Sequence, residues 1–437
     1  MKKEKISVIG LGFVGLTLAA VNAKKGFETI GIDTNVKKIE KNNKGESDFY
    51  EPELERILKK AIKDKKIKFT NNLKEILKTD ITFLTVGTPP AKKGEIDLSY
   101  VKKAISSIVK ILKTKKTKHT VVIKSTVVPT TTTKIIYPQF NKIKNVKVIV
   151  NPEFLRESLA IQDLLKPHLI VIGENKSGDG LELRKYYENF YKKCPEILFT
   201  DLVTAEMIKY SNNAFLATKI SFINSIANIC QNIPNTDVKT ITYAIGKDPR
   251  IGPQFLNAGP GFGGSCLPKD LSALINFSKK IHNESLILKS VKAINDDQPK
   301  KIINLIEKMG VFKKRNTISV LGVAFKKNTD DIRESKSISL VKILLRNGIK
   351  IKVHDPMALN NFKKIFKNRI EYCDTISDAI SQSHCCIIMT GWDEYKNLKI
   401  ENFETNMKKV NIIDAQRILN PKKFKNISFN AIGLGNN

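Results

Sequence analysis

The feature that most constrains the fold is the first stretch of the chain, where a short apolar strand runs into a glycine-rich turn. Residues 5–10 predict the strand, and "GLGFVG" places Gly10, Gly12 and Gly15 in the G-x-G-x-x-G spacing. A helix-periodic segment follows, "FETIGI" predicts a second strand, and Asp33 stands at its end. A strand, a tight turn, a helix and a second strand in this order predict a βαβ unit, the start of a doubly wound α/β domain.

The turn and the acid together indicate a nicotinamide or flavin dinucleotide site. Gly12 lets the backbone approach a pyrophosphate, whose charge would face the positive end of the following helix. Asp33 would accept hydrogen bonds from the adenosine ribose and repel a 2′-phosphate, so NAD is favoured over NADP. The predicted cofactor-binding residues here are Gly10, Gly12, Phe13, Val14, Gly15 and Asp33.

Two further apolar strands, in "DITFLTVGTPP" and "HTVVIKSTVVP", end in polar turns. Ligands gather at the carboxyl ends of strands in doubly wound sheets, so Thr88, Ser125 and Thr126 are candidate site residues. The alternative is that these hydroxyls only cap the helices that follow. The residues alone leave both interpretations open.

The remainder of the chain predicts a helical middle part and a second α/β domain. Residues 201–231 hold apolar residues at three- and four-residue intervals without a proline, which predicts one long connecting helix. From Asn316 strands and helices alternate again, but only Gly322 remains of the glycine turn. A nucleotide in another form, bound with Lys326 and Arg333, is therefore favoured over a second NAD. We expect an NAD-binding Rossmann-like domain, a helical middle domain and a second Rossmann-like domain at 1–200, 201–300 and 315–437.

Composition limits the class of protein. The chain of 437 residues is long enough for two or three domains and contains no apolar run that would span a bilayer. The amino terminus has the outline of a signal peptide, but cleavage there would remove the glycine turn, which favours a cytoplasmic protein. The formal net charge of +32 comes from lysines spread along the chain rather than gathered in one patch, which argues against a nucleic-acid partner.

The cysteines and histidines indicate no metal site. The five histidines are scattered singly, and the cysteines show neither paired nor C-x-x-C spacing. We therefore expect reduced thiols and no metal ion. The six cysteines are Cys194, Cys230, Cys266, Cys373, Cys385 and Cys386.

One of these cysteines lies in an unusual segment, "GPGFGGSCLPKD". Glycines on its amino-terminal side let the backbone approach a ligand closely. If Pro268 occupies a first helical position and Asp270 the first turn, Cys266 lies near the positive end of a helix, which favours a nucleophilic thiolate. The alternative is a glycine-rich hairpin in which the cysteine is a small buried filler.

Polar pairs with a four-residue spacing are further candidates. Glu153 and Glu157 in "NPEFLRES" would share one helical face if that segment is helical, and so would Lys209 and Asn213 in "EMIKYSNNAF". Cys266 and Asp270 repeat the spacing. The alternative is that the acids and the lysine are solvated surface groups.

Longer motifs point to a known family. In order along the chain they are "VIGLGFVGL", "VGTPP", "IKSTVVP", "NPEFLRES", "DPRIG", "GFGGSCLPKD" and "FKKNTDDIRES". On these motifs, which extend over almost its whole length, the chain resembles the UDP-glucose/GDP-mannose dehydrogenases. Their number and length make the resemblance far more specific than the glycine fingerprint alone.

The resemblance implies oxidation of a sugar C6 alcohol to a carboxylate through an aldehyde, with two NAD molecules used in succession. In the family, a cysteine matching Cys266 forms a thiohemiacetal and then a thioester, and Lys209 with Asn213 matches the groups that stabilise an oxyanion. Glu157, Thr126 and Asp270 match the residues that position water, and Glu153 supports them. The implied catalytic residues are Cys266, Lys209, Asn213, Asp270, Glu157, Thr126 and Glu153.

The resemblance also implies the ligand-binding residues and a homodimer in which Arg250 of "DPRIG" reaches the partner's site. The further cofactor residues are Thr88, Ser125, Thr126, Glu157 and Arg333. The implied nucleotide-sugar contacts are Phe154, Leu155, Lys209, Asn213, Arg250, Phe262, Gly263, Cys266, Phe325 and Lys326.

The substrate is less narrowly defined. Family members acting on N-acetylated UDP-sugars often have "GGHC", whereas Ser265 here makes "GGSC", which favours UDP-glucose or GDP-mannose. The expected reaction is UDP-glucose to UDP-glucuronate for a polysaccharide or glycan, with GDP-mannose or a UDP-N-acetylhexosamine as alternatives. Two other classes remain: a one-step 3-hydroxyacid dehydrogenase, which would not need Cys266, and a basic nucleic-acid-binding protein.

Overall fold

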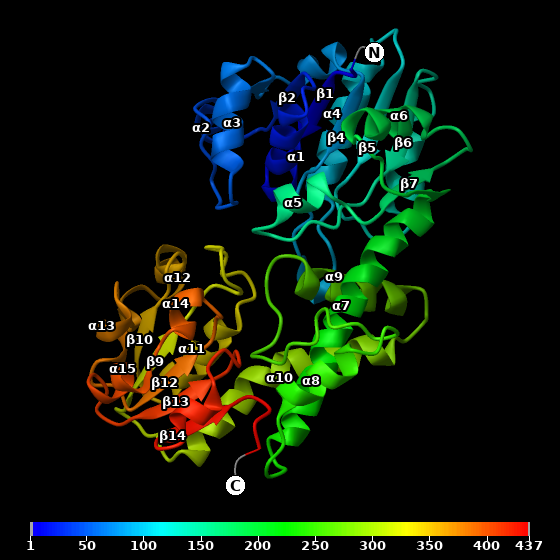
Figure 1. Ribbon diagram of the computed structural model, residues 1–437. Coiled ribbons are helices and arrows are strands. Elements are labelled where there is room, and N and C mark those ends of the chain that lie inside the picture. Colours follow the sequence, from blue (N-terminus) through cyan, green and yellow to red (C-terminus); the bar gives the residue numbers. More distant parts are fainter. Residues whose placement is uncertain (1–2, 436–437) are drawn as a thin grey trace. The chain divides into compact units, whose positions relative to one another are not determined.

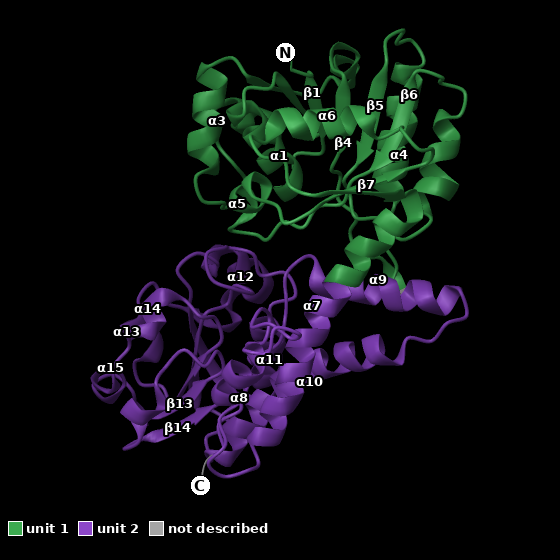
Figure 2. Ribbon diagram, turned by 45° about the vertical axis from the view of Figure 1, so that its right-hand side comes forward, with its two compact units in different colours: residues 1–212 green, residues 213–437 purple. Residues whose placement is uncertain are grey.

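Two parallel-stranded sheets organise the chain, which we describe from a computed structural model for residues 3–435. By their internal contacts the residues form two compact units, 1–212 and 213–437 (Figure 2). The boundary falls inside α7 (Leu202–Cys230), a helix of 29 residues. The long helix predicted from residues 201–231 is thus confirmed. The three expected domain ranges stay a prediction.

The sheet of the first unit has eight strands in the order β3-β2-β1-β4-β5-β6-β7-β8 (Figure 1). All neighbours pair in parallel except β6 and β7, which are antiparallel. The strands are β1 (Ile6–Ile9), β2 (Thr29–Ile32), β3 (Ile67–Thr70), β4 (Ile81–Leu84), β5 (His119–Ile123), β6 (Val146–Val150), β7 (Ile170–Glu174) and β8 (Ile197–Asp201).

Helices cover both faces of this sheet, and each face has its own apolar core (Figure 1). Ile6 and Val8 of β1 belong to one core and Ile9 to the other, as the alternation of side chains along a strand requires. The helices that complete the unit are α1 (Phe13–Lys24), α2 (Val36–Asn43), α3 (Leu54–Lys63), α4 (Ser99–Leu112), α5 (Ala160–Leu165) and α6 (Leu181–Phe190).

The second unit contains an all-parallel sheet of six strands in the order β11-β10-β9-β12-β13-β14. The predicted restart of strand and helix alternation after Asn316 is confirmed. The strands are β9 (Thr317–Leu321), β10 (Lys350–His354), β11 (Glu371–Tyr372), β12 (Cys385–Ile388), β13 (Asn411–Asp414) and β14 (Ser428–Ala431). The helices that follow α7 are α8 (Val238–Gly246), α9 (Leu267–Lys280), α10 (Leu286–Lys308), α11 (Lys336–Arg346), α12 (Leu359–Phe366), α13 (Ile376–Ile380), α14 (Asp393–Lys396) and α15 (Ile400–Glu404).

The segment "NPEFLRES" is not helical, so the shared helical face considered for Glu153 and Glu157 is wrong. Two backbone N–H groups of the segment donate to carboxylates. Leu155 N donates to Glu153 Oε2 at 2.5 Å, and Arg156 N donates to Asp163 Oδ2 at 2.9 Å. Side chains of this kind compete with helical hydrogen bonding, so the residues stay in a loop before α5.

No helix within residues 3–435 is both long and apolar enough to cross a membrane.

Candidate active site

The glycine turn after β1 has the form that a bound dinucleotide requires. Gly10 has a φ of 92°, and a Cβ there would lie 2.9 Å from the backbone of Val86. A Cβ on Gly15 would lie 1.9 Å from the Gly10 carbonyl oxygen, so helix α1 packs too close to the turn for a side chain. A Cβ on Gly12 would meet nothing within 4 Å. The open space at Gly12, in front of the amino terminus of α1, fits a pyrophosphate.

Asp33 follows β2 and faces this turn. Its Oδ2 accepts a hydrogen bond from Leu11 N at 2.8 Å, and its Oδ1 accepts one from Asn35 N at 3.0 Å. The carboxylate thus connects the glycine turn with the end of β2, where it can accept from ribose hydroxyls. Phe13 and Val14 in the first turn of α1 are half-buried, and the Phe13 ring lies 5.4 Å from that of Phe49.

The hydroxyl residues after β4 and β5 join two neighbouring loops. Thr88 Oγ1 donates to the carbonyl oxygen of Thr126 at 2.9 Å, and Ser125 Oγ donates to that of Val86 at 2.7 Å. None of the three caps a helix: the N-cap of α4 is Leu98, and the next helical segment begins after Thr131. The capping interpretation is therefore wrong, and the loops place these residues at the carboxyl ends of the strands.

Lys209 of α7 forms a buried ion pair in the first unit. Its Nζ lies 3.0 Å from Glu153 Oε1, and the two side chains are 5% and 6% exposed. The Lys209 ammonium also lies 5.5 Å from the centroid of the Phe154 ring. A charge held in such a protected place is not a solvated surface group, so the alternative drawn from the sequence is wrong for both residues. Leu155 and Glu157 of the same loop are half-buried.

Two buried ionisable residues beside these groups were missed from the sequence. Lys124 Nζ donates to Asn151 Oδ1 at 2.8 Å, and the pKa of Lys124 is lowered to about 8, chiefly by burial. Glu153 raises and Lys209 lowers that same pKa, which shows how closely the three charges are coupled. The signal was present in "VVIKST", where a lysine follows directly on an apolar strand.

Glu206, one turn before Lys209 on α7, is the second missed residue. Its Oε1 accepts from Thr132 N at 2.8 Å, and its buried Oε2 has no hydrogen-bond partner among the described residues. Burial raises the pKa of Glu206 to about 7. The helical spacing of α7 places this carboxyl in the protein interior, but its neighbour Thr132 is distant in sequence and could not be foreseen.

In the second unit, Cys266 is the N-cap of α9, so it lies at the positive end of a helix as the sequence predicted, and Pro268 is the second residue of that helix. Pro268 lies in the first turn of α9 with Asp270, whose N–H donates to the Cys266 carbonyl at 2.8 Å. The side chain of Cys266 is exposed, and its Sγ lies 3.6 Å from Ser265 Oγ. The positive end of a 14-residue helix favours a thiolate at this place.

Four of the other cysteines, Cys194, Cys373, Cys385 and Cys386, have surroundings that raise the pKa of the thiol. Burial raises the pKa of Cys373 to about 11 and also raises the pKa of Cys385 and Cys386. Cys194 is half-buried, Cys230 is buried, and none of the six forms a disulfide. Exposure and helix position together single out Cys266, so the buried-filler interpretation is wrong.

The glycines before Cys266 are required by close packing. A Cβ on Gly263 would lie 2.5 Å from the Glu334 carbonyl oxygen, and one on Gly264 would lie 2.8 Å from the Phe325 ring. The Gly264 N–H donates to the Arg333 carbonyl at 2.8 Å. The cysteine loop is therefore seated on the loop that follows β9.

Asn295, which the sequence analysis also missed, holds the cysteine loop through hydrogen bonds to the backbone of Phe262. Asn295 of α10 accepts from Phe262 N at 2.7 Å through Oδ1 and donates to the Phe262 carbonyl at 3.1 Å through Nδ2. This paired contact satisfies both backbone groups of the buried Phe262. Nothing in the sequence connects these two residues.

Asp270 is buried beside Cys266 and has two side-chain partners. Asn213 Nδ2 donates to its Oδ2 at 2.6 Å, and Lys269 Nζ lies 2.5 Å from its Oδ1. Asn213 lies four residues after Lys209 on α7, which is helical as predicted. This helix therefore carries both the lysine that pairs with Glu153 and the asparagine that binds Asp270. The structure thus brings Asn213, Asp270 and the start of α9 together.

The predicted nucleotide-sugar cations lie on loops of the second unit. Lys326 Nζ lies 5.8 Å from the Phe325 ring centroid, and the Arg333 guanidinium forms a two-pronged contact with Asp331. Arg250 forms a similar contact with Asp248, and its side chain is 87% exposed. Each arginine is thereby oriented by a neighbouring carboxylate.

No group of His, Cys, Asp and Glu side chains in residues 3–435 is arranged to hold a metal ion. A dinucleotide turn with an acid after its second strand, together with an exposed cysteine at a helix amino terminus, is the arrangement expected of an NAD-dependent dehydrogenase that uses a thiol.

The three domains of one protein family, the UDP-glucose/GDP-mannose dehydrogenases, match successive parts of the chain. Its NAD binding domain matches residues 4–191, its central domain residues 203–297, and its UDP binding domain residues 319–421. The chain therefore belongs to the UDP-glucose/GDP-mannose dehydrogenase family. It is an NAD-dependent oxidoreductase of nucleotide sugars with an α/β fold.

Individual relatives agree over the whole length. A UDP-glucose 6-dehydrogenase from Rickettsia bellii is 40% identical over 433 residues, which cover 98% of this chain and 99% of the relative. A UDP-glucose dehydrogenase structure from Pyrobaculum islandicum has a TM-score of 0.91 at 33% identity, covering 100% of this chain and 98% of that one. A UDP-D-ManNAc dehydrogenase structure from Pyrococcus horikoshii has a TM-score of 0.86 at 26% identity, covering 99% of both chains.

Proposed function

We propose that the protein oxidises the C6 alcohol of UDP-glucose to the carboxylate of UDP-glucuronate in two successive steps. The observation that carries the proposal is the exposed Cys266 at the amino terminus of α9, beside the Asn213 and Asp270 pair. A dehydrogenase that stops after one oxidation needs no nucleophile there. The similarity to UDP-glucose dehydrogenases over the whole chain supports this choice of sugar.

The first step converts the alcohol to an aldehyde. Bound NAD accepts one hydride at each oxidation. Lys209, held by Glu153 at 3.0 Å, donates a hydrogen bond to the oxygen of the alcohol as the hydroxyl proton passes to a base-linked water. Because the ion pair is buried, its orientation is established before the substrate arrives, and little reorganisation is needed in the transition state.

The second step requires the thiol. The Cys266 thiolate adds to the aldehyde carbon and gives a thiohemiacetal, from which a second hydride leaves to form a thioester. Water then attacks the thioester carbonyl, the carbon–sulfur bond breaks, and the thiolate is restored. Asp270, oriented by Asn213 and Lys269, lies one turn into α9, where we assign it the positioning of this water. For Glu157 and Thr126 the same role is supported only by the match to the family's motifs. Overall, one alcohol, one water and two NAD give one carboxylate, two NADH and three protons.

Counting NADH per sugar tests the proposal directly. We expect purified protein with excess NAD to form two NADH for each UDP-glucose consumed, with UDP-glucuronate as the product. One NADH per sugar would contradict the role of Cys266, because the reaction would then end at the aldehyde. GDP-mannose and UDP-N-acetylmannosamine are assayed in parallel, and faster turnover of either one would overturn the choice of UDP-glucose.

We also propose that the protein acts as a homodimer. Phe215, Phe222 and Ile229 follow one another at seven-residue intervals on α7 and are 65%, 51% and 56% exposed. Seven residues are two helical turns, so the three side chains form one apolar stripe, which we call the α7 stripe. Such a stripe on a water-soluble surface fits a second copy of the same helix. The exposed Arg250 guanidinium is suited to reach the partner's bound diphosphate.

A charge placed in the α7 stripe should separate the dimer. We expect Phe222→Glu to convert the protein from dimer to monomer in light scattering at micromolar concentration, because a carboxylate would be buried without a partner. Ile287→Glu is the matched control, since Ile287 is 70% exposed on α10 outside the stripe. A dimer that persists in Phe222→Glu, or one lost equally in Ile287→Glu, would contradict the assignment.

The thiol chemistry also bears on the cellular compartment. We propose a cytoplasmic enzyme whose uronic acid product serves polysaccharide or glycan synthesis. The support is that Cys266 must stay reduced to act as a nucleophile and that the six cysteines form no disulfide.

A further inference from the structure

The loop after β9 is held by one carboxylate, that of Asp355 at the end of β10. Gly322 directly after β9 has a φ of 92°, the same value as Gly10 directly after β1. In both sheets the next strand supplies an acid at its carboxyl end, Asp33 in the first and Asp355 in the second. The two turns are thus built alike, and their acids can be compared directly.

The two acids differ in how many protein groups they bind. Asp33 accepts one N–H from its glycine turn, that of Leu11. Asp355 Oδ2 accepts two, from Val323 N at 2.7 Å and Ala324 N at 3.0 Å. The C-terminal acid is therefore committed to the protein's own backbone, whereas a second dinucleotide would require that backbone and acid for itself.

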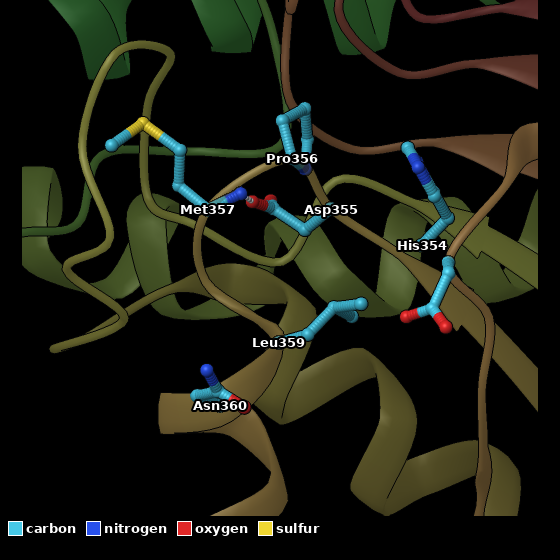
Figure 3. A pocket seen from close by; sticks show the side chains of 7 residues that line it. His354, Asp355, Pro356, Met357, Leu359 and Asn360 are labelled. Carbon is cyan, nitrogen blue, oxygen red and sulfur yellow. Dashed lines mark hydrogen bonds between the residues drawn. The ribbon is translucent and has the colours of Figure 1, made fainter.

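The remaining contacts join three segments of the second unit at this one side chain. Asp355 Oδ1 accepts from Met357 N at 2.9 Å (Figure 3). The same oxygen accepts from Ala358 N at 2.8 Å. Trp392 Nε1, beyond the end of β12, donates to Oδ2 at 3.2 Å. With five N–H donors and 3% exposure, the carboxylate anchors the β9, β10 and β12 ends to one another.

The anchored backbone leads straight into residues with predicted ligand contacts. Ala324 precedes Phe325 and Lys326, and the Phe325 N–H donates to the Asp331 carbonyl at 3.0 Å, which closes the loop. The same loop carries the Arg333 carbonyl that receives Gly264 N of the cysteine loop. Displacement of residues 323–324 would therefore move both the substrate cations and the support beneath Cys266.

We propose that Asp355 is a positioning residue for nucleotide-sugar binding, acting through the backbone of Val323 and Ala324 on Phe325 and Lys326. This inference rests on the proposed function for its ligand. The side chain itself touches no substrate in this account. Asp355 occupies the position where, in a dinucleotide-binding sheet, an acid such as Asp33 would bind the ribose. In this second sheet the acid instead fixes the loop that receives a different nucleotide.

The test replaces Asp355 by asparagine and measures UDP binding by calorimetry. The amide retains the size of the side chain, but its NH₂ group must face backbone or indole N–H donors on one side. We expect UDP affinity and the KM for UDP-glucose to worsen by about tenfold or more, with kcat changed by less than about threefold. NAD affinity should stay at the wild-type value, because the glycine turn of β1 is untouched.

Asp374→Asn is the matched control, since Asp355 and Asp374 both line a cavity of about 240 Å³ but Asp374 is exposed. It should bind UDP like the wild type. If Asp355→Asn does not fold, Trp392→Phe removes one of the five donors while keeping an aromatic ring, and a two- to threefold loss of UDP affinity is expected. Wild-type UDP affinity in folded Asp355→Asn would overturn the inference.

Hydrogen exchange separates this inference from the proposed function. The amides of Val323 and Ala324 should exchange faster in Asp355→Asn than in the wild type, with no ligand present. If the wild type fails to bind UDP, the proposed substrate is wrong, whereas unchanged exchange at these two amides would refute the positioning role whatever the substrate.

Discussion

Cys266→Ser is expected to abolish the formation of the sugar acid, with a loss of about 10³-fold or more in steady-state turnover. A serine hydroxyl is not ionised at neutral pH and forms no thioester, so the second hydride cannot leave along the normal route. The first oxidation does not need the thiol. We therefore expect at most one NADH per active site, formed in a burst, with an aldehyde-level species retained on the protein.

The measurement is rapid-mixing absorbance of NADH together with chromatography of the sugar product. Cys194→Ser is the control, because Cys194 is half-buried in the first unit and burial raises its pKa. It should produce acid at the wild-type rate. Acid formation by Cys266→Ser at that rate would exclude Cys266 as the nucleophile.

Lys209→Ala is expected to lower kcat by about 10²- to 10³-fold while changing the KM for the sugar much less. The reason is that the ammonium interacts most strongly with an oxygen that becomes negative in the transition state. A loss confined to KM would contradict the oxyanion role. Lys110→Ala on α4, where the lysine is exposed, should leave both constants unchanged.

Removal of Lys209 also leaves Glu153 buried without its partner, which by itself destabilises a fold. The double variant Lys209→Met with Glu153→Gln separates the two effects. It removes both charges of the pair, so its thermal stability should recover relative to Lys209→Ala. Its kcat should stay low, because the donor to the oxyanion is still missing.

The local features of the fold were predictable because they depend on neighbours in sequence. The turn at Gly10, Gly12 and Gly15 is specified by backbone conformation and by the space that a side chain would need. The long helix α7 was visible in its apolar periodicity, and Cys266 at the start of α9 was visible from the Pro268 and Asp270 that follow it. In each case a few adjacent residues are enough to determine the local structure.

Other features were wrongly predicted, not predicted or left open, because side-chain contacts and strand pairing decide them. "NPEFLRES" has helical spacing, yet the carboxylates of Glu153 and Asp163 accept hydrogen bonds from backbone N–H groups of the segment. The antiparallel pairing of β6 and β7 departs from an otherwise parallel sheet, and a single strand carries no mark of its partner's direction. Thr88 looked equally suited to a cap, and only the observed start of α4, whose N-cap is Leu98, excluded that role.

The sequence by itself determined the fold class, the dinucleotide turn, the family and the place of Cys266 at a helix amino terminus. These properties are encoded in short motifs whose chemistry is local. Only the tertiary structure decided which charges are buried together, as with Glu153 and Lys209, and that Asp355 anchors the loop bearing Lys326. The reason is physical: burial, ion pairing and the sharing of N–H donors arise when segments far apart in the chain pack against one another, and no local pattern records those contacts.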